Sequence, residues 1–459
     1  MKTTPDISIS DLRANLNGNL IVPDDPRYDD VRGVFFTGFD QRPAAIVRAA
    51  DASDVSRVVS LARETGAELA VRSGGHSRAG YGTSEGGIVL DLSAMNAVDI
   101  DADGRTAWAE TGATAGDYTK ATGEHGLATG LGDTPTVGLG GITLSGGIGF
   151  FVRRNGLTID DLLAAEVVTA DGELIEVDEE THAELFWALR GGGGNFGVVT
   201  RLRLRLHEID QIVGGMLMLP ARTDVITGLL TAAEAAPEEL SIIANVIKAP
   251  PLPFIPAESH GKPVVIALMV YAGGAEEGER AIAPIRALAT PLADMVRPMH
   301  YPEMYAGPEG PRTAFDAGTN MLVGSFASGA AEAILEHLET SAAPMAGVQL
   351  RVLGGAMARV PADATAFGHR EAKLMMNIAA MYARTEERPQ LEAWVSSVAN
   401  ALSGGTPTAA YVGFLGNDGE HGVRRAYPPA TLERLARVKR RYDSDNLFRL
   451  NLNVLPDAT

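Results

Sequence analysis

The segment Arg72-Ser-Gly-Gly-His-Ser77 places a histidine beside two glycines, directly after an apolar stretch. Successive glycines allow positive φ angles, let the main chain approach a ligand closely and can form an anion-binding arrangement of amides. A histidine is a neutral nucleophile near physiological pH. The residues therefore indicate either a ligand-binding loop with a reactive imidazole at His76 or a tight turn with an exposed histidine.

A second glycine-rich segment runs from Asp133 to Gly149. Six of the twelve positions from Gly138 to Gly149 are glycine. Ordering so many glycines costs considerable backbone entropy, which a purely structural loop rarely requires. The composition favours a loop that lies against a large, flat ligand.

Three common motifs with glycine do not account for these segments. No Gly-x-Gly-x-x-Gly opens a helix with an acidic residue about twenty positions later, and no Gly-Lys-Ser/Thr completes a phosphate-binding loop. The sequence Gly82-Thr-Ser-Glu-Gly86 matches Gly-x-Ser-x-Gly, but no helix is expected behind it. A nucleophile elbow needs that helix, so we do not expect one here.

The elements around these loops indicate an α+β organisation. Residues 51–66 are expected to form a helix that begins near Asp51 and ends at Gly66. An apolar strand at 68–71 leads into the histidine loop. Residues 167–177 are typical of a hairpin with Asp-Gly at its turn, and a further strand is expected over 198–206.

The character of the sequence changes after about residue 208. Long amphipathic helices alternate with apolar strands, and the helices are expected at about 223–236, 276–289, 329–341 and 388–402. From about residue 408 we expect a strand, followed by a helix that ends near Tyr442. A chain of 459 residues is too long for one compact core, so two domains are the natural expectation.

Four motifs in order resemble those of a known family. They are Arg-Ser-Gly-Gly-His-Ser77, the pair Pro135-Thr-Val-Gly-Leu-Gly-Gly141 and Ser145-Gly-Gly-Ile-Gly149, Arg190-Gly-Gly-Gly-Gly-Asn-Phe-Gly-Val-Val199, and Tyr442-Asp-Ser-Asp-Asn-Leu-Phe-Arg449. The chain resembles the berberine bridge enzyme-like branch of the vanillyl-alcohol oxidase flavoproteins, which have a PCMH-type FAD domain. The resemblance covers nearly the whole chain, most strongly residues 40–205 and 408–455, and in character it is nearest to the bacterial hydroxynicotine oxidase-like members.

The resemblance implies a fold and domain boundaries. The fold is α+β, with a PCMH-type FAD-binding domain of two α/β subdomains and an inserted substrate domain of antiparallel sheet backed by helices. The FAD domain is expected at residues 1–207, the substrate domain at 208–404, and a C-terminal return to the FAD domain at 405–459. Substrate is expected to bind where the sheet faces the flavin ring.

The resemblance also implies a cofactor and the residues that hold it. His76 matches the histidine that bonds covalently to the flavin 8α carbon. Many relatives add a cysteinyl bond at the position of Thr134, but this chain has no cysteine, so attachment would be through His76 alone. The other expected cofactor-binding residues are Arg72, Ser73, Gly74, Gly75, Ser77, Thr134, Pro135, Thr136, Val137, Gly138, Gly140, Gly141, Ser145, Gly146, Gly147, Gly149, Val198, Val199, Asn451 and Asn453.

The catalytic residues are less defined, because the chain departs from the family at several positions. Asn155 stands where several alcohol-oxidising relatives have a tyrosine, and Gln349 stands where some plant members have a glutamate base. The frequent Tyr-x-Asn-Tyr becomes Tyr411-Val-Gly-Phe414. Tyr411, Asn155, Gln349 and Tyr382 are weak candidates, so the catalytic residue is unknown, and the lost polar groups suggest a rather apolar pocket.

These departures bear on the reaction. A neutral amine can lose hydride without a base, because its lone pair stabilises the cation, whereas an alcohol reacts best when a base takes its proton. We therefore expect an FAD-dependent oxidase that acts on an amine or on an activated alcohol, phenolic compound or secondary metabolite and produces hydrogen peroxide. Val137, where dehydrogenases often have leucine, favours an oxidase. The alternatives are a dehydrogenase with another electron acceptor and a catalytically silent flavin-binding protein.

Composition limits the partners. The formal net charge is −19, which argues against nucleic acid. The basic run at 437–441 is interpreted as a solvated helix face. No apolar run is long enough to span a membrane, no segment near the N-terminus resembles a signal peptide, and the histidines show no metal-ligand spacing. The expected partners are a small-molecule substrate and molecular oxygen, with no metal and no membrane, and the cytoplasm is the expected location.

Overall fold

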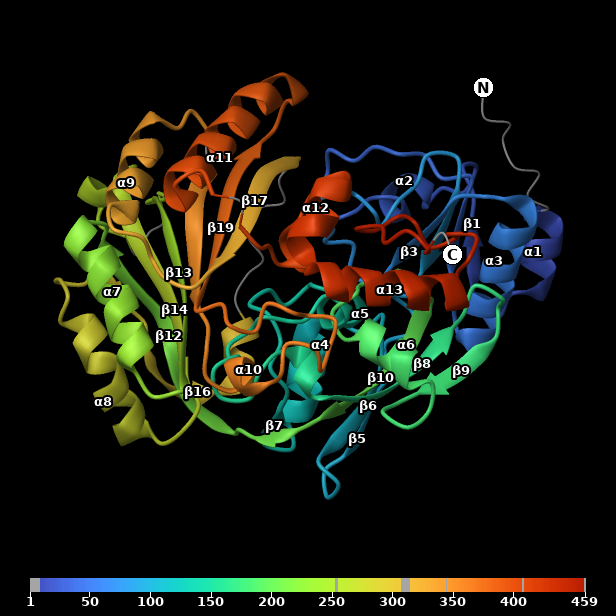
Figure 1. Ribbon diagram of the computed structural model, residues 1–459, viewed down its shortest axis with the longest axis horizontal. Helices are drawn as coiled ribbons and strands as arrows, with labels where there is room; N and C mark the ends of the chain where they lie inside the picture. Colours follow the sequence, from blue (N-terminus) through green and yellow to red (C-terminus); the bar gives the residue numbers. More distant parts are fainter. Residues whose placement is uncertain (1–8, 252–254, 307–313, 344, 407, 458–459) are drawn as a thin grey trace.

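The protein is described here by a computed structural model that covers residues 9–251, 255–306, 314–343, 345–406 and 408–457. Figure 1 shows two lobes side by side. The first contains the N-terminal half of the chain together with the two C-terminal helices, and the second contains one large sheet with helices on its outer face. The α+β class expected from the sequence is confirmed, since both lobes combine helices with sheets and the second lobe is an antiparallel sheet backed by helices.

A four-stranded sheet forms the first part of the first lobe, in the order β1-β2-β4-β3. Its strands are β1 (Asn19–Ile21), β2 (Ala45–Arg48), β3 (Leu69–Arg72) and β4 (Ile88–Asp91). Helix α3 (Ala52–Thr65) connects β2 to β3; its first turn is capped by the Asp51 carboxylate, and Gly66 ends it with φ of 68°. The predicted helix at 51–66 and the strand before the histidine loop are thus confirmed.

A five-stranded antiparallel sheet forms the second part of this lobe, in the order β5-β6-β10-β8-β9. Its strands are β5 (Val98–Asp101), β6 (Thr106–Glu110), β8 (Leu162–Val168), β9 (Leu174–Val177) and β10 (Val198–Arg205). Gly172, with φ of 79°, lies in the turn between β8 and β9, so the predicted hairpin is confirmed. Helices α4 (Ala115–Gly123), α5 (Leu139–Leu144) and α6 (Ala183–Leu189) accompany this sheet.

The second lobe is built on an antiparallel sheet in the order β15-β12-β14-β13-β18-β19-β17, with β16 also paired to β12. The strands are β12 (Gln211–Pro220), β13 (Leu240–Lys248), β14 (Pro263–Tyr271), β15 (Ala293–Asp294), β16 (Arg297–His300), β17 (Phe315–Val323), β18 (Met345–Val352) and β19 (Leu374–Tyr382). Four helices cover its outer face in Figure 1, and they confirm the four predicted amphipathic helices. They are α7 (Thr223–Ala235), α8 (Ala275–Arg286), α9 (Ala330–Thr340) and α11 (Arg388–Ser403).

The C-terminal segment returns to the first lobe as α12 (Gly419–Ala426) and α13 (Pro429–Tyr442), and α13 packs against α6. The strand predicted from about residue 408 is wrong. The chain there makes one bridge, between Leu322 and Ala409, followed by a 3-10 turn at Val412–Phe414. The reason is that the backbone N–H and C=O of Tyr411 are bonded to the side-chain amide of Asn320 instead of to a neighbouring strand.

The basic run on α13 is not entirely a solvated face. Lys439 is fully buried, and its ammonium group lies 2.6 Å from the equally buried carboxylate of Asp443. The same group donates to the carbonyls of Asn195 and Phe448. The prediction failed because the periodicity of α13 turns Lys439 inward, while its neighbours Arg440 and Arg441 remain exposed.

The remaining elements are short. They are α1 (Ile9–Asn15), α2 (Tyr28–Val31), β7 (Leu127–Ala128), β11 (His207–Glu208), α10 (Ala356–Arg359) and the 3-10 turns Thr158–Asp160, Ala257–Ser259, Tyr301–Tyr305 and Thr385–Glu387. In the described part of the chain, no helix is long and apolar enough to cross a membrane. The boundaries at 207 and 404 remain predictions from the sequence.

Candidate functional site

A cavity of about 430 Å³ is lined by residues of both lobes. One side, which we call the glycine wall, consists of the lining residues within 72–77, 134–145 and 192–199. The other side, which we call the sheet wall, consists of Asp316 on β17, Arg351 on β18, Met381 on β19 and residues 411–415. The cavity therefore lies between the glycine loops of the first lobe and the large sheet of the second.

Most of the predicted cofactor-binding residues line this cavity. They are Arg72, Ser73, Gly74, Gly75, His76, Ser77, Thr134, Val137, Gly138, Gly140, Gly141, Ser145, Val198, Val199 and Asn451. The predicted residues outside its lining are Pro135, Thr136, Gly146, Gly147, Gly149 and Asn453.

The histidine loop is held at the end of β3 by close backbone packing. A Cβ on Gly74 would lie 2.2 Å from the backbone nitrogen of Gly138, so only glycine fits between the two glycine segments. Gly75 takes a φ of 72°. The hydroxyl of Ser73 donates to the carbonyl of Thr111. These contacts fix the loop that presents His76 to the cavity.

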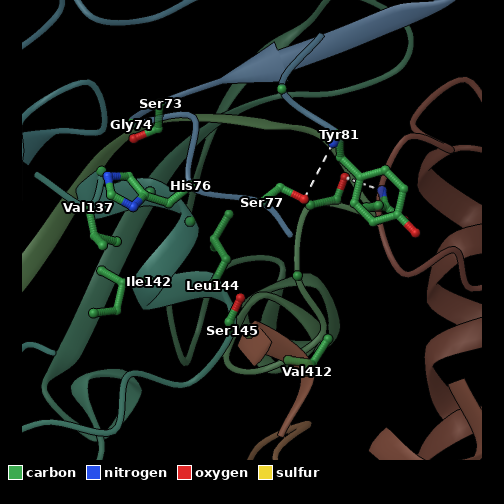
Figure 2. A pocket seen from close by; sticks show the side chains of 18 of the residues that line it. Ser73, Gly74, His76, Ser77, Tyr81, Val137, Ile142, Leu144, Ser145 and Val412 are labelled. Carbon is green, nitrogen blue, oxygen red and sulfur yellow. Dashed lines mark hydrogen bonds between the residues drawn. The ribbon is translucent and has the colours of Figure 1, made fainter. Parts of the chain in front are cut away.

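The imidazole of His76 is oriented by an aromatic neighbour. It stacks on the ring of Phe35, with centroids 4.1 Å apart and an interplanar angle of 24°. Figure 2 shows the imidazole close to Val137, while Tyr81 lies on the opposite side of the pocket. Leu144 lies between His76 and Tyr81 in this view, and Ile142 lies below Val137 on the side of His76. Such a histidine sits at one edge of the cavity, where it could bond to the edge of a flat ring.

The guanidinium of Arg72 points into the first lobe. Its Nη2 lies 3.0 Å from a carboxylate oxygen of Asp91 and 2.8 Å from the carbonyl of Val31, and its Nη1 donates to Gly33. The Arg72 side chain is almost fully buried. Although Arg72 lines the cavity, its charged group therefore anchors the histidine loop.

The glycines of the second segment divide into two roles. Gly141 on α5 is exposed within the cavity, and a Cβ there would meet no atom within 4 Å. By contrast, a Cβ on Gly147 would lie 2.0 Å from the Thr158 hydroxyl, and one on Gly149 would lie 1.4 Å from the Leu131 carbonyl. The first leaves space for a ligand, whereas the last two allow close packing of the protein itself.

The sequence motif at 190–199 contributes the third part of the glycine wall. Gly192, Gly193, Gly194 and Asn195 all line the cavity, and a Cβ on Gly194 would again meet nothing within 4 Å. This motif contributed to the family resemblance, but only Val198 and Val199 were predicted to contact the cofactor. The run of four glycines was the signal that could have extended the assignment.

Of the four weak catalytic candidates, only Tyr411 lines the cavity. Its hydroxyl accepts a hydrogen bond from the Gly147 amide at 3.0 Å, and complete burial raises its pKa. Tyr382 stacks on Phe315 in the core of the second lobe. Asn155 and Gln349 do not line the cavity, but Gln349 accepts a hydrogen bond from Nε of Arg351 at 2.8 Å.

Two arginine–aspartate pairs that were not predicted from the sequence line the cavity. Arg351 Nη2 lies 2.9 Å from a carboxylate oxygen of Asp133, and Arg78 Nε lies 2.8 Å from one of Asp316. Both guanidinium groups lie over the ring of Phe414, at 5.0 Å and 5.5 Å from its centroid. Much of the cavity lining is apolar, as expected. The prediction of a rather apolar pocket did not include these four charged groups.

The inner face of the large sheet carries a row of amides. Asn245, Gln349, Asn377 and Asn320 are in register across β13, β18, β19 and β17. The Gln349 side chain donates to Asn245 at 3.0 Å, and Asn377 accepts from Arg78 at the same distance. Because these residues are paired directly across the strands, their side chains lie on one face of the sheet. Gln349 and Asn377 each accept a hydrogen bond from one of the two arginines, whereas the Asn320 side chain is bonded to the backbone of Tyr411.

The cavity has features that fit a dinucleotide with a flat ring. Backbone without side chains at Gly141 and Gly194 leaves open space, and the buried Oδ1 of Asn451 has no hydrogen-bond partner in the described structure. An acceptor of that kind suits a donor on a bound ring. Among the described residues, no group of three or more histidine, aspartate and glutamate side chains could hold a metal ion.

Comparison with known proteins agrees with this geometry. Residues 43–178 match the FAD binding domain family, and residues 410–455 match the family described as berberine and berberine like. The chain is 34% identical to (R)-6-hydroxynicotine oxidase of Paenarthrobacter nicotinovorans, over 97% of this chain and 98% of that protein. The chain belongs to the berberine bridge enzyme-like family.

Further relatives and solved structures extend the likeness. Berberine bridge enzyme-like 6 of Arabidopsis thaliana is 27% identical, with 90% of this chain and 81% of that protein covered. The crystal structure of 6-hydroxy-D-nicotine oxidase from Arthrobacter nicotinovorans superposes with a TM-score of 0.85 at 30% identity and covers 96% of this chain and 98% of that one. A chitooligosaccharide oxidase, at 21% identity and a TM-score of 0.83, covers 98% of each chain and shares the fold.

As a member of this family, the protein is an FAD-linked oxidoreductase. The glycine wall carries most of the residues that the family motifs assign to the cofactor, and the sheet wall faces it. The cofactor loop of this chain was therefore recognisable from family motifs, whereas no motif predicted the charged residues of the sheet wall.

Proposed function

We propose that the protein is an oxidase that carries FAD on a single covalent bond to His76 and oxidises a small organic substrate, either an amine or an activated alcohol, phenolic compound or secondary metabolite. The observation that supports it best is the position of His76 at the edge of a cavity lined by the predicted cofactor residues. The chain has no cysteine, so a second bond from that residue type is excluded.

When bound, FAD would supply a hydride acceptor at ring N5 and pass the electrons to oxygen, giving hydrogen peroxide. The residues of this chain would hold and orient the reactants. His76 would tether the ring edge, Gly141 and Gly194 would let it approach the backbone, and Val137 would border it. Residues of the sheet wall would hold the substrate against the opposite side.

The preference for an amine rests on the four acid–base candidates predicted from the sequence, of which only Tyr411 lines the cavity. Burial raises the pKa of this phenol, so it stays protonated near neutrality and is a poor proton acceptor. The carboxylate of Asp316 also lines the cavity, but it is paired with Arg78. Hydride loss from a neutral amine needs no such acceptor. The similarity to a hydroxynicotine oxidase is in keeping with this preference.

The proposal is tested by measuring hydrogen peroxide with a panel of small amines, alcohols and sugars. We expect peroxide with at least one amine or activated alcohol. Turnover of sugars alone would contradict the amine preference.

Two alternatives are separated by a second measurement. After photoreduction of the flavin, rapid reoxidation in air supports an oxidase, whereas slow reoxidation with fast electron transfer to a dye supports a dehydrogenase. Reoxidation without turnover of any compound in the panel would favour a catalytically silent flavin-binding protein.

A further inference from the structure

Only one of the two carboxyl oxygens of Asp316 has a hydrogen-bond or ion-pair partner in the described structure. Its Oδ2 lies 2.8 Å from Nε of Arg78, but its Oδ1 is buried and has no hydrogen-bond partner in the described structure. The side chain is 2% exposed, and Asp316 lines the cavity. A buried carboxylate oxygen without a donor is costly, so this atom calls for an explanation.

Among the described residues, those around Asp316 supply no second donor to its carboxyl group. Met381, its partner across the β17–β19 ladder, also lines the cavity and has only a weakly accepting thioether. Nη1 of Arg78 is directed to the Asn377 side chain at 3.0 Å and to the Phe414 carbonyl at 3.4 Å. Burial raises the pKa of Asp316 against the opposing charge of Arg78, as expected for an incompletely solvated carboxylate.

The protein holds this arrangement in place from several directions. A Cβ on Gly318, two residues along β17, would lie 2.6 Å from Nη1 of Arg78, so glycine makes room for the guanidinium. Phe315, the preceding residue, stacks on Tyr382 with centroids 5.1 Å apart. The carboxyl group is thus fixed with one oxygen committed to Arg78 and the other available.

The position of Asp316 indicates what the missing donor belongs to. Most of the residues assigned to the cofactor lie on the glycine wall, whereas Asp316 belongs to the sheet wall. A molecule held between the sheet and the cofactor would lie against Asp316. The two arginine–aspartate pairs are electrically balanced, which suits a neutral donor better than an extra charge.

We propose that Oδ1 of Asp316 accepts a hydrogen bond from a hydroxyl or N–H group of the substrate, and that this contact selects substrates with such a donor over their methylated analogues. The inference rests on the proposed function, because it assigns part of the substrate site of that enzyme. A site built to bond a hydroxyl or N–H rejects an analogue without it strongly, since its own buried polar group is then left unpaired.

The test uses the purified, flavin-containing protein and two neutral probe pairs, phenol with anisole and aniline with N,N-dimethylaniline. Dissociation constants are obtained from the change in flavin absorbance on titration, without turnover. We expect the wild type to bind phenol and aniline at least tenfold more tightly than their methylated partners.

The variant Asp316→Asn sharpens the test. Arg78 can only donate at its Nε, so the amide oxygen should stay towards Arg78 and the amide NH₂ should replace Oδ1. The acceptor becomes a donor, and the preference for phenol over anisole should fall to within twofold or reverse. Asp224→Asn is the matched control, because Asp224 forms an exposed pair with Arg222 in the same lobe; it should keep the wild-type preference.

The inference would be overturned if the wild-type protein bound both members of either probe pair equally, or bound neither detectably. It would also be overturned if Asp316→Asn kept a tenfold preference for phenol over anisole. If the variant does not fold, which its melting curve and flavin content reveal, the wild-type ratios decide. Absence of peroxide with every amine and alcohol would refute the proposed function while leaving these ratios measurable, so the two failures are distinguishable.

Discussion

The two walls of the cavity differ in how they are made. The glycine wall is largely backbone, and the atoms that would meet a ligand are amides and Cα groups of residues such as Gly141 and Gly194. The sheet wall presents charged and aromatic side chains, among them Arg351, Asp316 and Phe414. A backbone surface can bind the same cofactor across a family, whereas a side-chain surface can change with each substrate.

The two walls should therefore respond differently to substitution. Changes on the glycine wall should affect flavin content and the stability of the holoenzyme. Changes on the sheet wall should affect the binding of small molecules and leave the flavin in place.

The largest effect is expected for His76→Ala. No flavin should remain with the acid-precipitated variant, because the only proposed covalent bond is lost. The native variant should still take up FAD reversibly, since the glycine wall is unchanged. Absorbance of the redissolved precipitate measures the flavin that stays attached, and fluorescence of free FAD during titration measures reversible FAD binding. A variant precipitate that stays yellow would disprove attachment through His76.

Replacement of Lys439 by methionine should destabilise the protein by about 3–5 kcal/mol, because it leaves the Asp443 carboxylate buried without its counter-charge. It also removes the bond to the Asn195 carbonyl, which holds one end of the glycine wall. Urea unfolding measures the loss. The exposed neighbour Arg440 provides the control, and Arg440→Met should change stability by no more than about 0.5 kcal/mol; equal effects would show that the buried pair has no special role.

A smaller effect is expected for Gln349→Leu, which acts on the sheet wall indirectly through Arg351. The variant removes the acceptor for Nε of Arg351, which retains its bonds to Asp133 and to the Ile148 carbonyl. Loss of one such bond should lower the free energy of unfolding by about 0.5–1.5 kcal/mol. Because Arg351 is then held less firmly at the cavity, affinity for a bound small molecule should also fall, as titration of the flavin absorbance measures. Flavin content should not change, and a variant that loses flavin would contradict the division between the walls.

The smallest effect is expected for Gly141→Ala, which should act in opposite directions on two properties. Alanine in place of a helical glycine should stabilise flavin-free protein by about 0.5–1 kcal/mol. Its Cβ would occupy cavity space, so the flavin-loaded fraction should fall. Gly324→Ala, at another open position outside the cavity lining, should leave flavin content unchanged; a Gly141→Ala variant with full flavin would show that the space is not used.

The same contrast explains what the sequence could predict. Periodicity and caps located α3, α7, α8, α9 and α11 closely, because amphipathic helices carry their pattern locally. The histidine loop was recognisable because only glycine permits its backbone conformation. These signals lie within short segments of the chain.

The sheet wall could not be predicted in this way. Asp316, Arg351 and Arg78 come from segments far apart in the sequence, and nothing in their local patterns indicates that the fold brings them together. Lys439 was misassigned for a similar reason, since its buried partners Asn195 and Phe448 belong to other segments. The segment at 411–414 was taken as a strand because its bonding to the Asn320 side chain is a tertiary contact.

The central claim is the covalent bond between His76 and the cofactor. The most direct test is the intact mass of the denatured wild-type protein, recorded with its absorbance spectrum. We expect the polypeptide mass increased by that of one FAD less two hydrogen atoms, because the bond replaces one hydrogen on the imidazole and one on the flavin 8α carbon, and we expect a flavin spectrum that persists after acid precipitation. A colourless protein at the mass of the bare polypeptide would contradict the claim.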